Sequence, residues 1–468
     1  MNISKKEAAF IGYMILEIVT VVCFFSFVKV STVNKALSTI GLIAIFTGIS
    51  TTYLIYKIYN RINFFVLFIA LSFLFAFGQS ILVCLGVEMP KSAFSITYSG
   101  FQIDELINAA VFCFLGIIST CIGYCLYYKK RVPETKEKPI IETNDRVCKI
   151  GWLLLIISIV PTFYLLYKDI VGAFQYGYGY TLQAYTGFDR ICSLVSGFFT
   201  SSLIILFSFE QSKNKRKCFW IILILYVLFQ LLGGSRLSVF RLGITLIVLY
   251  ICFFKKMDTK KLVILTVTAL CVGFIFSIVS NARIYLTGGD IKNVIANATA
   301  SVWENNFLVS IIREMGITQI INTLVYAKCP MVVGFQYGFS YLKIIWAVLP
   351  NLIGSAYTGY IGVDITFSPL YTLTDSGLGA SYLCEGYWNF GWFALLAFLV
   401  LGFLFGKLES KFYELCNSRT VDPIKLFLIS YIIYYMIFMV RSEMISFGRA
   451  FVYYALVPAL LCKVKIKH

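Results

Sequence analysis

The sequence predicts an all-α polytopic integral membrane protein with about 12 transmembrane helices and one long connection outside the membrane. Three observations support this fold class. Of the 468 residues, 59% are hydrophobic and 13% are charged, which leaves too little polar material to solvate a globular surface of this size. Apolar runs of roughly 20 residues, the length that crosses a hydrocarbon core, recur along the whole chain. Basic residues gather in alternate connections, as they do in proteins that cross a bilayer many times.

The N-terminal membrane region, residues 1–128, contains four apolar runs. They cover residues 8–28, 38–56, 63–86 and 105–128. The runs are apolar on all sides instead of alternating, so each predicts a helix, because a span in lipid must satisfy its own backbone hydrogen bonds. Residues 129–149 carry prolines and mixed charges, which predicts a solvated cytoplasmic linker after this region.

The central membrane region, residues 150–280, and the C-terminal three-span region, residues 390–468, supply the remaining helices. Spans are predicted at residues 150–167, 191–209, 219–232, 239–254, 262–280, 389–408, 424–440 and 448–462. The runs at 219–232 and 239–254 are short for a full crossing. No internal repeat relates the two halves of the chain, which disfavours the inverted-repeat architecture of a secondary transporter.

Lysine and arginine residues set the predicted orientation, because they are biased toward cytoplasmic loops. Basic clusters at 5–6, 57–61, 129–131, 213–217, 255–261, 407–411 and 463–467 fall on one side of this arrangement. Both termini are therefore predicted in the cytoplasm, and residues 281–389 form one long periplasmic loop. The net charge of +17 has the same origin. Basic loops beside a membrane meet anionic headgroups, so membrane lipids are expected partners and nucleic acid is not.

The long loop is itself largely apolar. Residues 311–325 and 339–349 have helical apolar spacing but are too short or too polar to span, and Pro350 ends the second stretch. They predict short interfacial helices that lie on or dip into the outer leaflet and roof a cavity. A chamber that is half in and half out of the membrane suits a lipid-linked substrate.

A glycine-rich break on the outer side separates the runs 219–232 and 239–254. Arg236 directly follows two glycines and a serine, and Arg241 comes one and a half turns later. An arginine at this depth is costly unless it faces protein or water, and its guanidinium offers a fork of donors suited to phosphate oxygens. The alternative is an arginine side chain that snorkels from a helix end to the headgroups.

A second outer hairpin joins the last two spans. Arg441 and Arg449 bracket this short connection, on the face where basic residues should be sparse. Together with Arg236, Arg241 and Arg283 they predict an electropositive pocket that binds a diphosphate. The alternative is a simple ion pair between Arg441 and its neighbour Glu443.

Acid, base and sugar-binding candidates lie near the ends of the outer loops. Asp375 and Glu385 flank a run of glycines and small polar residues, and a carboxylate partly removed from water can take a proton from a sugar hydroxyl. The alternatives are a helix cap at Asp375 and a salt bridge at Glu385. Tyr178 and Tyr180, in the outer loop 168–190, could stack on sugar rings or belong to an interfacial aromatic belt. His468 is the only histidine, so a histidine base and a histidine-rich metal site are excluded.

The order of several short motifs resembles a known family. The motifs are the break at 233–236, the segment 340–350, the run 377–381 followed by Glu385, residues 389–391, and the glycine-containing span 401–407. In this order they resemble the O-antigen and oligosaccharide repeat-unit polymerases called Wzy. The resemblance covers the second half of the chain well and the first half in hydropathy alone.

The resemblance implies a metal-independent glycosyltransferase of GT-C-like fold in the bacterial inner membrane. Such enzymes join undecaprenyl-diphosphate-linked oligosaccharides on the periplasmic side without a cofactor, and a chain-length regulator protein is a candidate partner. Arg236, Arg441 and Arg449 would then stabilise the leaving diphosphate, while Glu385 or Asp375 would accept a proton.

Two other functions stay open at this point. A flippase or transporter of lipid-linked glycan would also have many spans and a basic cavity, although it seldom needs one long outer loop. An O-antigen ligase would share the general fold, but related ligases use an outer-loop histidine that this chain lacks.

Overall fold

The computed structural model describes residues 5–59, 63–88, 98–127, 145–176, 187–232, 236–253, 306–348, 380–418 and 421–463, with a few isolated positions between 274 and 300. Every regular element within these ranges is helical, which confirms the all-α class. Nine helical stretches in the described ranges are long and apolar enough to cross a membrane, so the chain is polytopic. The total of about 12 spans stays a prediction. The predicted span 262–280 lies outside the described ranges apart from two single positions.

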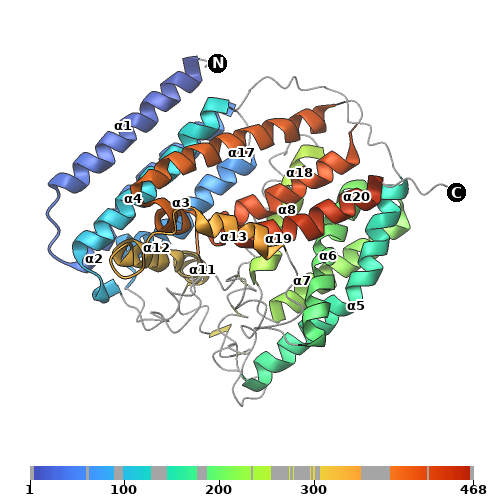
Figure 1. The fold of residues 1–468 in the computed structure, drawn as a ribbon. Coiled ribbons are helices and arrows are strands. Elements are labelled where there is room, and N and C mark those ends of the chain that lie inside the picture. Colours follow the sequence, from blue (N-terminus) through green and yellow to red (C-terminus); the bar gives the residue numbers. More distant parts are fainter. Residues whose placement is uncertain are drawn as a thin grey trace.

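The first group of helices combines the N-terminal region with one helix from the end of the chain (Figure 1). Its members are α1 (Lys5–Phe27), α2 (Val33–Tyr59), α3 (Phe64–Cys84), α4 (Ile103–Tyr127) and α17 (Ala394–Asn417). Helix α2 packs along α3, and α4 packs along both α17 and α1. The C-terminal region therefore completes the core of the N-terminal group.

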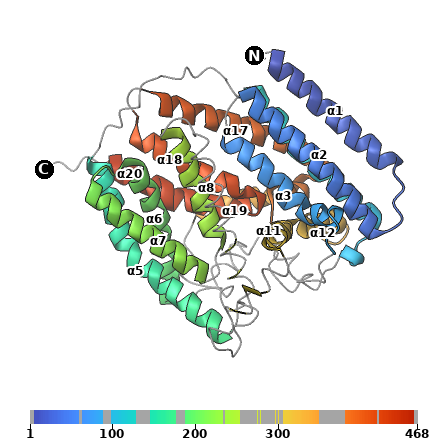
Figure 2. The same ribbon diagram turned by 180° about the vertical axis from the view of Figure 1, so that it is seen from behind.

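The second group lies on the other side of the molecule, as Figure 2 shows from behind. It contains α5 (Asp145–Tyr176), α6 (Phe188–Phe209), α7 (Lys213–Leu232) and α8 (Arg236–Phe253). Helix α18 (Pro423–Met436), which ends in the 3-10 turn η4 (Ile437–Val440), joins the groups, because α18 packs against α6 and α8 while η4 packs against α3.

Shorter helices occupy the space between the two groups. They are α11 (Phe307–Met315), α12 (Thr318–Lys328), α13 (Phe339–Ala347), α16 (Tyr382–Phe390) and α19 (Met444–Phe451). Helix α12 contacts α3, α4 and α16, while α13 lies along α19 (Figure 1). Helix α19 continues through a π-helical turn, η5 (Val452–Leu456), into α20 (Val457–Lys463).

Two sequence predictions about these elements need correction. The single helix predicted at 311–325 is two helices, α11 and α12, because Gly316 packs directly on α3: a Cβ at Gly316 would lie 2.4 Å from the backbone nitrogen of Gln79. Together residues 308–328 do have the length and hydropathy of a span, contrary to the prediction. The span predicted at 389–408 is also longer, since α16, the turn η3 (Gly391–Phe393) and α17 form one helical stretch from Tyr382 to Asn417. Helix α13 matches the stretch predicted at 339–349.

Two glycines allow α4 and α17 to pack at close range. A Cβ at Gly123 would lie 1.9 Å from the carbonyl oxygen of Leu399, and a Cβ at Gly402 would lie 1.9 Å from the carbonyl oxygen of Thr120. Each helix thus presents a glycine to the backbone of the other. Small residues at such crossings let helices approach within a membrane, where lipid tails are as apolar as the helices themselves.

Gly402→Ala should destabilise the protein by about 1–3 kcal/mol, because the new methyl group must push α17 away from a rigid backbone carbonyl. Thermal unfolding of the detergent-solubilised protein measures the effect. The control is Gly12→Ala in α1, where no atom lies within 4 Å of the new Cβ and the helix should become slightly more stable. Equal melting temperatures for the two variants would contradict the close packing of α4 on α17.

Candidate functional site

A buried carboxylate joins three helices that are distant in the sequence. Glu385 lies on α16, whose first turn is capped by the Ser381 hydroxyl, and its side chain is 1% exposed. The hydroxyl of Ser340, on α13, donates a hydrogen bond of 3.0 Å to Oε1 of Glu385. The backbone nitrogen of Met444, the first residue of α19, donates one of 2.8 Å to Oε2. Both carboxylate oxygens are therefore engaged.

Asn389 extends this network on the same face of α16. Its Nδ2 donates to the Ser340 hydroxyl at 2.7 Å and to the carbonyl of Glu385 at 2.7 Å, and its Oδ1 accepts from the backbone nitrogen of Gly338 at 3.0 Å. Tyr337 and Gly338 both have positive φ, 49° and 86°, which forms the tight turn that leads into α13. A hydrogen bond thus joins two motif segments that are distant in the sequence, 340–350 and 389–391.

Glu385 also supplies a capping hydrogen bond at the N-terminus of α19, by accepting from the backbone nitrogen of Met444. Glu443 is the N-cap residue of that helix, but its own side chain makes no capping hydrogen bond. A carboxylate at a helix N-terminus is favourable because the unpaired N–H groups there carry partial positive charge. Helix α13 reinforces the contact: a Cβ at Gly448 would lie 1.9 Å from Cγ2 of Ile344, so the two helices are in close packing. The start of α19 is therefore fixed from outside its own segment.

Two of the predicted diphosphate ligands lie near the start and the end of α19: Arg441 is in the connection between α18 and α19, and Arg449 is in the last turn of α19. Arg441 and Arg449 are both partly exposed. Glu443 lies between them in the sequence, and its Oε2 is buried without a hydrogen-bond partner. The predicted alternative, a simple ion pair between Arg441 and Glu443, stays a prediction. Burial raises the pKa of the Glu443 carboxyl above its ordinary value.

Arg241 stands in a cage of aromatic side chains. Its guanidinium carbon lies 5.1 Å, 4.8 Å and 4.4 Å from the ring centres of Tyr434, Tyr435 and Phe438. Its Nε is buried and has no hydrogen-bond partner. The cation therefore faces protein instead of snorkelling to headgroups, which corrects that alternative for Arg241. Cation–π contacts stabilise the charge while leaving guanidinium donors unused.

The other predicted site residues lie outside the part that the structure describes. Arg236 is the first residue of α8, but its side chain is among the undescribed ones. Arg283, Asp375, Tyr178 and Tyr180 fall entirely outside the described ranges. Their roles stay predictions.

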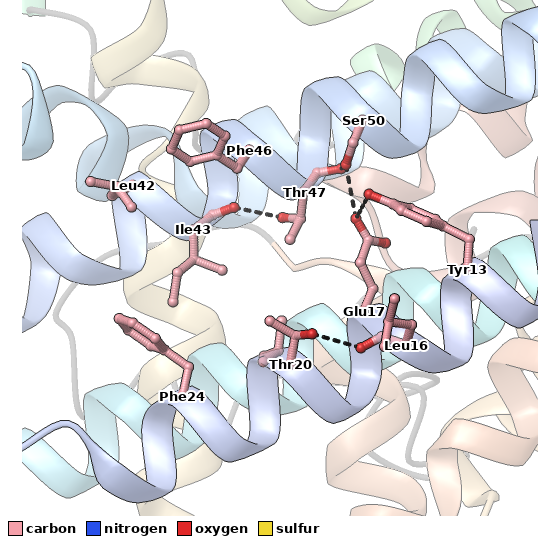
Figure 3. A pocket seen from close by; sticks show the side chains of 11 residues that line it. Tyr13, Leu16, Glu17, Thr20, Phe24, Leu42, Ile43, Phe46, Thr47 and Ser50 are labelled. Atoms are coloured by element: carbon pink, nitrogen blue, oxygen red, sulfur yellow. Dashed lines mark hydrogen bonds between the residues drawn. The ribbon is translucent and has the colours of Figure 1, made fainter.

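A groove of about 310 Å³ lies between α1 and α2, away from this network (Figure 3). Its walls are mostly apolar, and Glu17 lies at one end. Oε1 of Glu17 accepts hydrogen bonds from the hydroxyls of Tyr13 and Ser50, and Oε2 accepts from Thr51. The charge that the sequence places within this span is thus satisfied by hydroxyl groups of its own helix and of α2.

Sequence reasoning did not identify the hydrogen-bond and aromatic partners of the predicted site residues. Ser340 and Glu385 both lie in motif segments, yet nothing in the sequence indicates that they are bonded. Three aromatic residues at the end of α18, with i, i+1 and i+4 spacing, were the available signal for the cage around Arg241. The unpartnered oxygen of Glu443 has no sequence signal at all.

Comparison with known proteins gives one match. The model of the family described as O-antigen polysaccharide polymerase Wzy matches residues 13–468, nearly the whole chain. No curated protein and no solved structure matches. The predicted likeness to GT-C enzymes therefore stays a prediction.

Asn389→Ala should lower the free energy of unfolding by on the order of 2 kcal/mol, because it leaves the partly buried amide of Gly338 without an acceptor and removes the donor to Ser340. Thermal unfolding in detergent measures the loss. The control is Asn214→Ala, an exposed position near the start of α7, which should leave the melting temperature unchanged. A melting temperature equal to wild type for Asn389→Ala would show that the network does not stabilise the fold.

Proposed function

Because this chain belongs to the O-antigen polysaccharide polymerase Wzy family, we propose that it polymerises undecaprenyl-diphosphate-linked oligosaccharide repeat units into O-antigen or a related surface polysaccharide. The match over residues 13–468 is the observation that carries this proposal. The many apolar helices add support, since a lipid-linked substrate has to be reached from within a membrane.

The proposed reaction is a displacement at the anomeric carbon of the growing chain. A hydroxyl group of the incoming repeat unit attacks this carbon and forms the new glycosidic bond. The bond between the sugar and the diphosphate breaks, and its electron pair leaves with the lipid diphosphate. The hydroxyl proton passes to a base, so the step needs no metal and no nucleotide sugar. The sequence offers Glu385 and Asp375 as the carboxylates for this proton.

Arginine side chains would stabilise the charge that develops on the leaving diphosphate. Fixed donors in a site of low dielectric are suited to this task, because they need no reorganisation as the charge appears. Arg441 lies on the hairpin that the Glu385 network holds, Arg449 lies in the last turn of α19, and Arg236 and Arg283 are proposed to join them. Arg241 supports the same pocket from α8, since its aromatic cage holds the cation in place without a carboxylate partner among the described residues.

The location and partners of the enzyme follow from the same proposal. The chain is an integral membrane protein, and we place it in the bacterial inner membrane with both termini in the cytoplasm and the active site on the periplasmic side. Tyr178 and Tyr180 would stack against the sugars of the repeat unit. A chain-length regulator protein is a candidate partner.

Purified protein incubated with undecaprenyl-diphosphate-linked repeat units should give a ladder of products that differ by one unit. Electrophoresis or mass spectrometry of the released glycans measures it. Proteoliposomes without any polymerised product, but with lipid-linked units moved from one leaflet to the other, would show a flippase instead. Transfer of finished glycan to a different acceptor would show a ligase.

Arg449→Ala and Arg441→Ala should each lower the rate of polymerisation by about 100-fold, because each removes donors from the developing diphosphate charge. Arg236→Ala should abolish long polymer while leaving protein levels and single lipid-linked units intact. The control is Arg216→Ala, which lies in the basic cluster predicted to face the cytoplasm and should polymerise normally. Normal polymer length in the first three variants would remove arginine from the mechanism.

A further inference from the structure

The two carboxyl groups at the start of α19 have different surroundings. Glu385 is 1% exposed, and its oxygens accept hydrogen bonds from Ser340 and Met444. Glu443 is partly exposed, and its Oε2 has no hydrogen-bond partner. When neighbouring carboxyls differ in this way, the difference points to separate roles.

Glu385 lacks the access that a proton acceptor needs. A general base must come within hydrogen-bond reach of the hydroxyl that it deprotonates. Here the lone pairs of Glu385 are directed at Ser340 and at the backbone of Met444, and almost no surface of the side chain is open. Its contacts are those of a structural anchor.

Glu443 differs from Glu385 in that its Oε2, although buried, accepts no hydrogen bond. It lies in the connection between α18 and α19, with Arg441 before it and Arg449 after it in the predicted diphosphate pocket. Its backbone is extended, with φ −76° and ψ 154°, and its side chain does not cap its own helix. Burial raises the pKa of its carboxyl, which makes the carboxylate a better proton acceptor. Arg441 and Ser442 precede it in this connection, and α16 contributes Glu385, whose carboxylate is an electrostatic neighbour of Glu443.

We propose that Glu443 is the catalytic base of the polymerisation reaction and that Glu385 is a positioning residue that holds the backbone of Glu443. This inference rests on the polymerase function proposed above. The O–H bond of the incoming sugar breaks, its proton goes to a carboxylate oxygen of Glu443, and its electron pair forms the C–O bond to the anomeric carbon. The C–O bond to the diphosphate breaks, and that electron pair leaves on the diphosphate beside the arginines.

The positioning role follows from one hydrogen bond. Met444 N belongs to the peptide group that directly follows the Cα of Glu443, and Glu385 accepts its hydrogen. This bond fixes the orientation of that peptide and so the direction in which the Glu443 side chain leaves the chain. Since Glu385 does the capping, the Glu443 carboxylate is not needed for it.

The test compares the same substitution at both carboxyls in the polymer-ladder assay. Glu443→Gln should lower the polymerisation rate by about 100-fold or more, because an amide cannot accept the proton. Glu385→Gln should keep the rate within a few-fold of wild type, because the amide oxygen can accept from Met444 and the amide nitrogen can donate to Ser340. Glu385→Ala cannot do either and should lose activity, so rescue by glutamine distinguishes positioning from proton transfer. Glu17→Gln, a buried carboxyl in α1, is the matched control and should be fully active.

Stability measurements make every outcome decisive. Glu443→Gln should melt at or above the wild-type temperature, because the amide can replace the buried Oε2, which accepts no hydrogen bond; a variant that fails to accumulate would overturn the assignment. Glu385→Gln being as inactive as Glu385→Ala, or Glu443→Gln being active, would also overturn it. If Glu385→Ala does not fold, Glu385→Gln still carries the test. Absence of a ladder with wild-type protein would instead refute the polymerase function itself.

Discussion

The constraint on which this structure depends is the absence of water around most of the chain. In lipid, a polar group that finds no partner within the protein costs several kcal/mol, so each one restricts how the helices can meet. Glu385 shows the effect most clearly. Its two oxygens require donors, and they find them on α13 and at the start of α19. The same bonds that satisfy one carboxylate therefore decide the arrangement of three helices drawn from the long loop and the end of the chain.

The molecule handles its other buried charges in different ways. Glu17 is satisfied by three hydroxyl groups, and Arg241 is held by three aromatic rings. Glu443 is the contrast, because one of its oxygens is buried without any partner. Other described residues also bury an atom without a hydrogen-bond partner, such as the Nε of Arg241, so Glu443 is singled out by its position beside Arg441 as well as by its free oxygen.

The fold could be predicted further than the site, and for a physical reason. An apolar run indicates that lipid surrounds the segment, and this can be predicted without knowledge of its neighbours. Helices α1 to α8 accordingly lie close to the predicted spans. The break between α11 and α12 could not be predicted, because it depends on α3 packing against Gly316. Partners of charged residues depend on tertiary contacts in the same way. Arginine and glutamate candidates could be chosen by residue type, whereas the aromatic cage of Arg241 and the bond from Ser340 to Glu385 depend on how distant helices pack.

A single carboxylate cannot serve both as an anchor and as a base, because an anchor needs permanent donors and a base needs a free lone pair when the substrate arrives. The conflict is strong in the connection between α18 and α19, because in the proposed mechanism this short segment carries a cation for the diphosphate and the base, and it must also begin a helix. This conflict does not arise when the residue that caps α19 lies on another helix, as Glu385 does on α16. Glu385 supplies the acceptor that α19 requires, so Oε2 of Glu443 accepts no hydrogen bond and the helix start still has its acceptor.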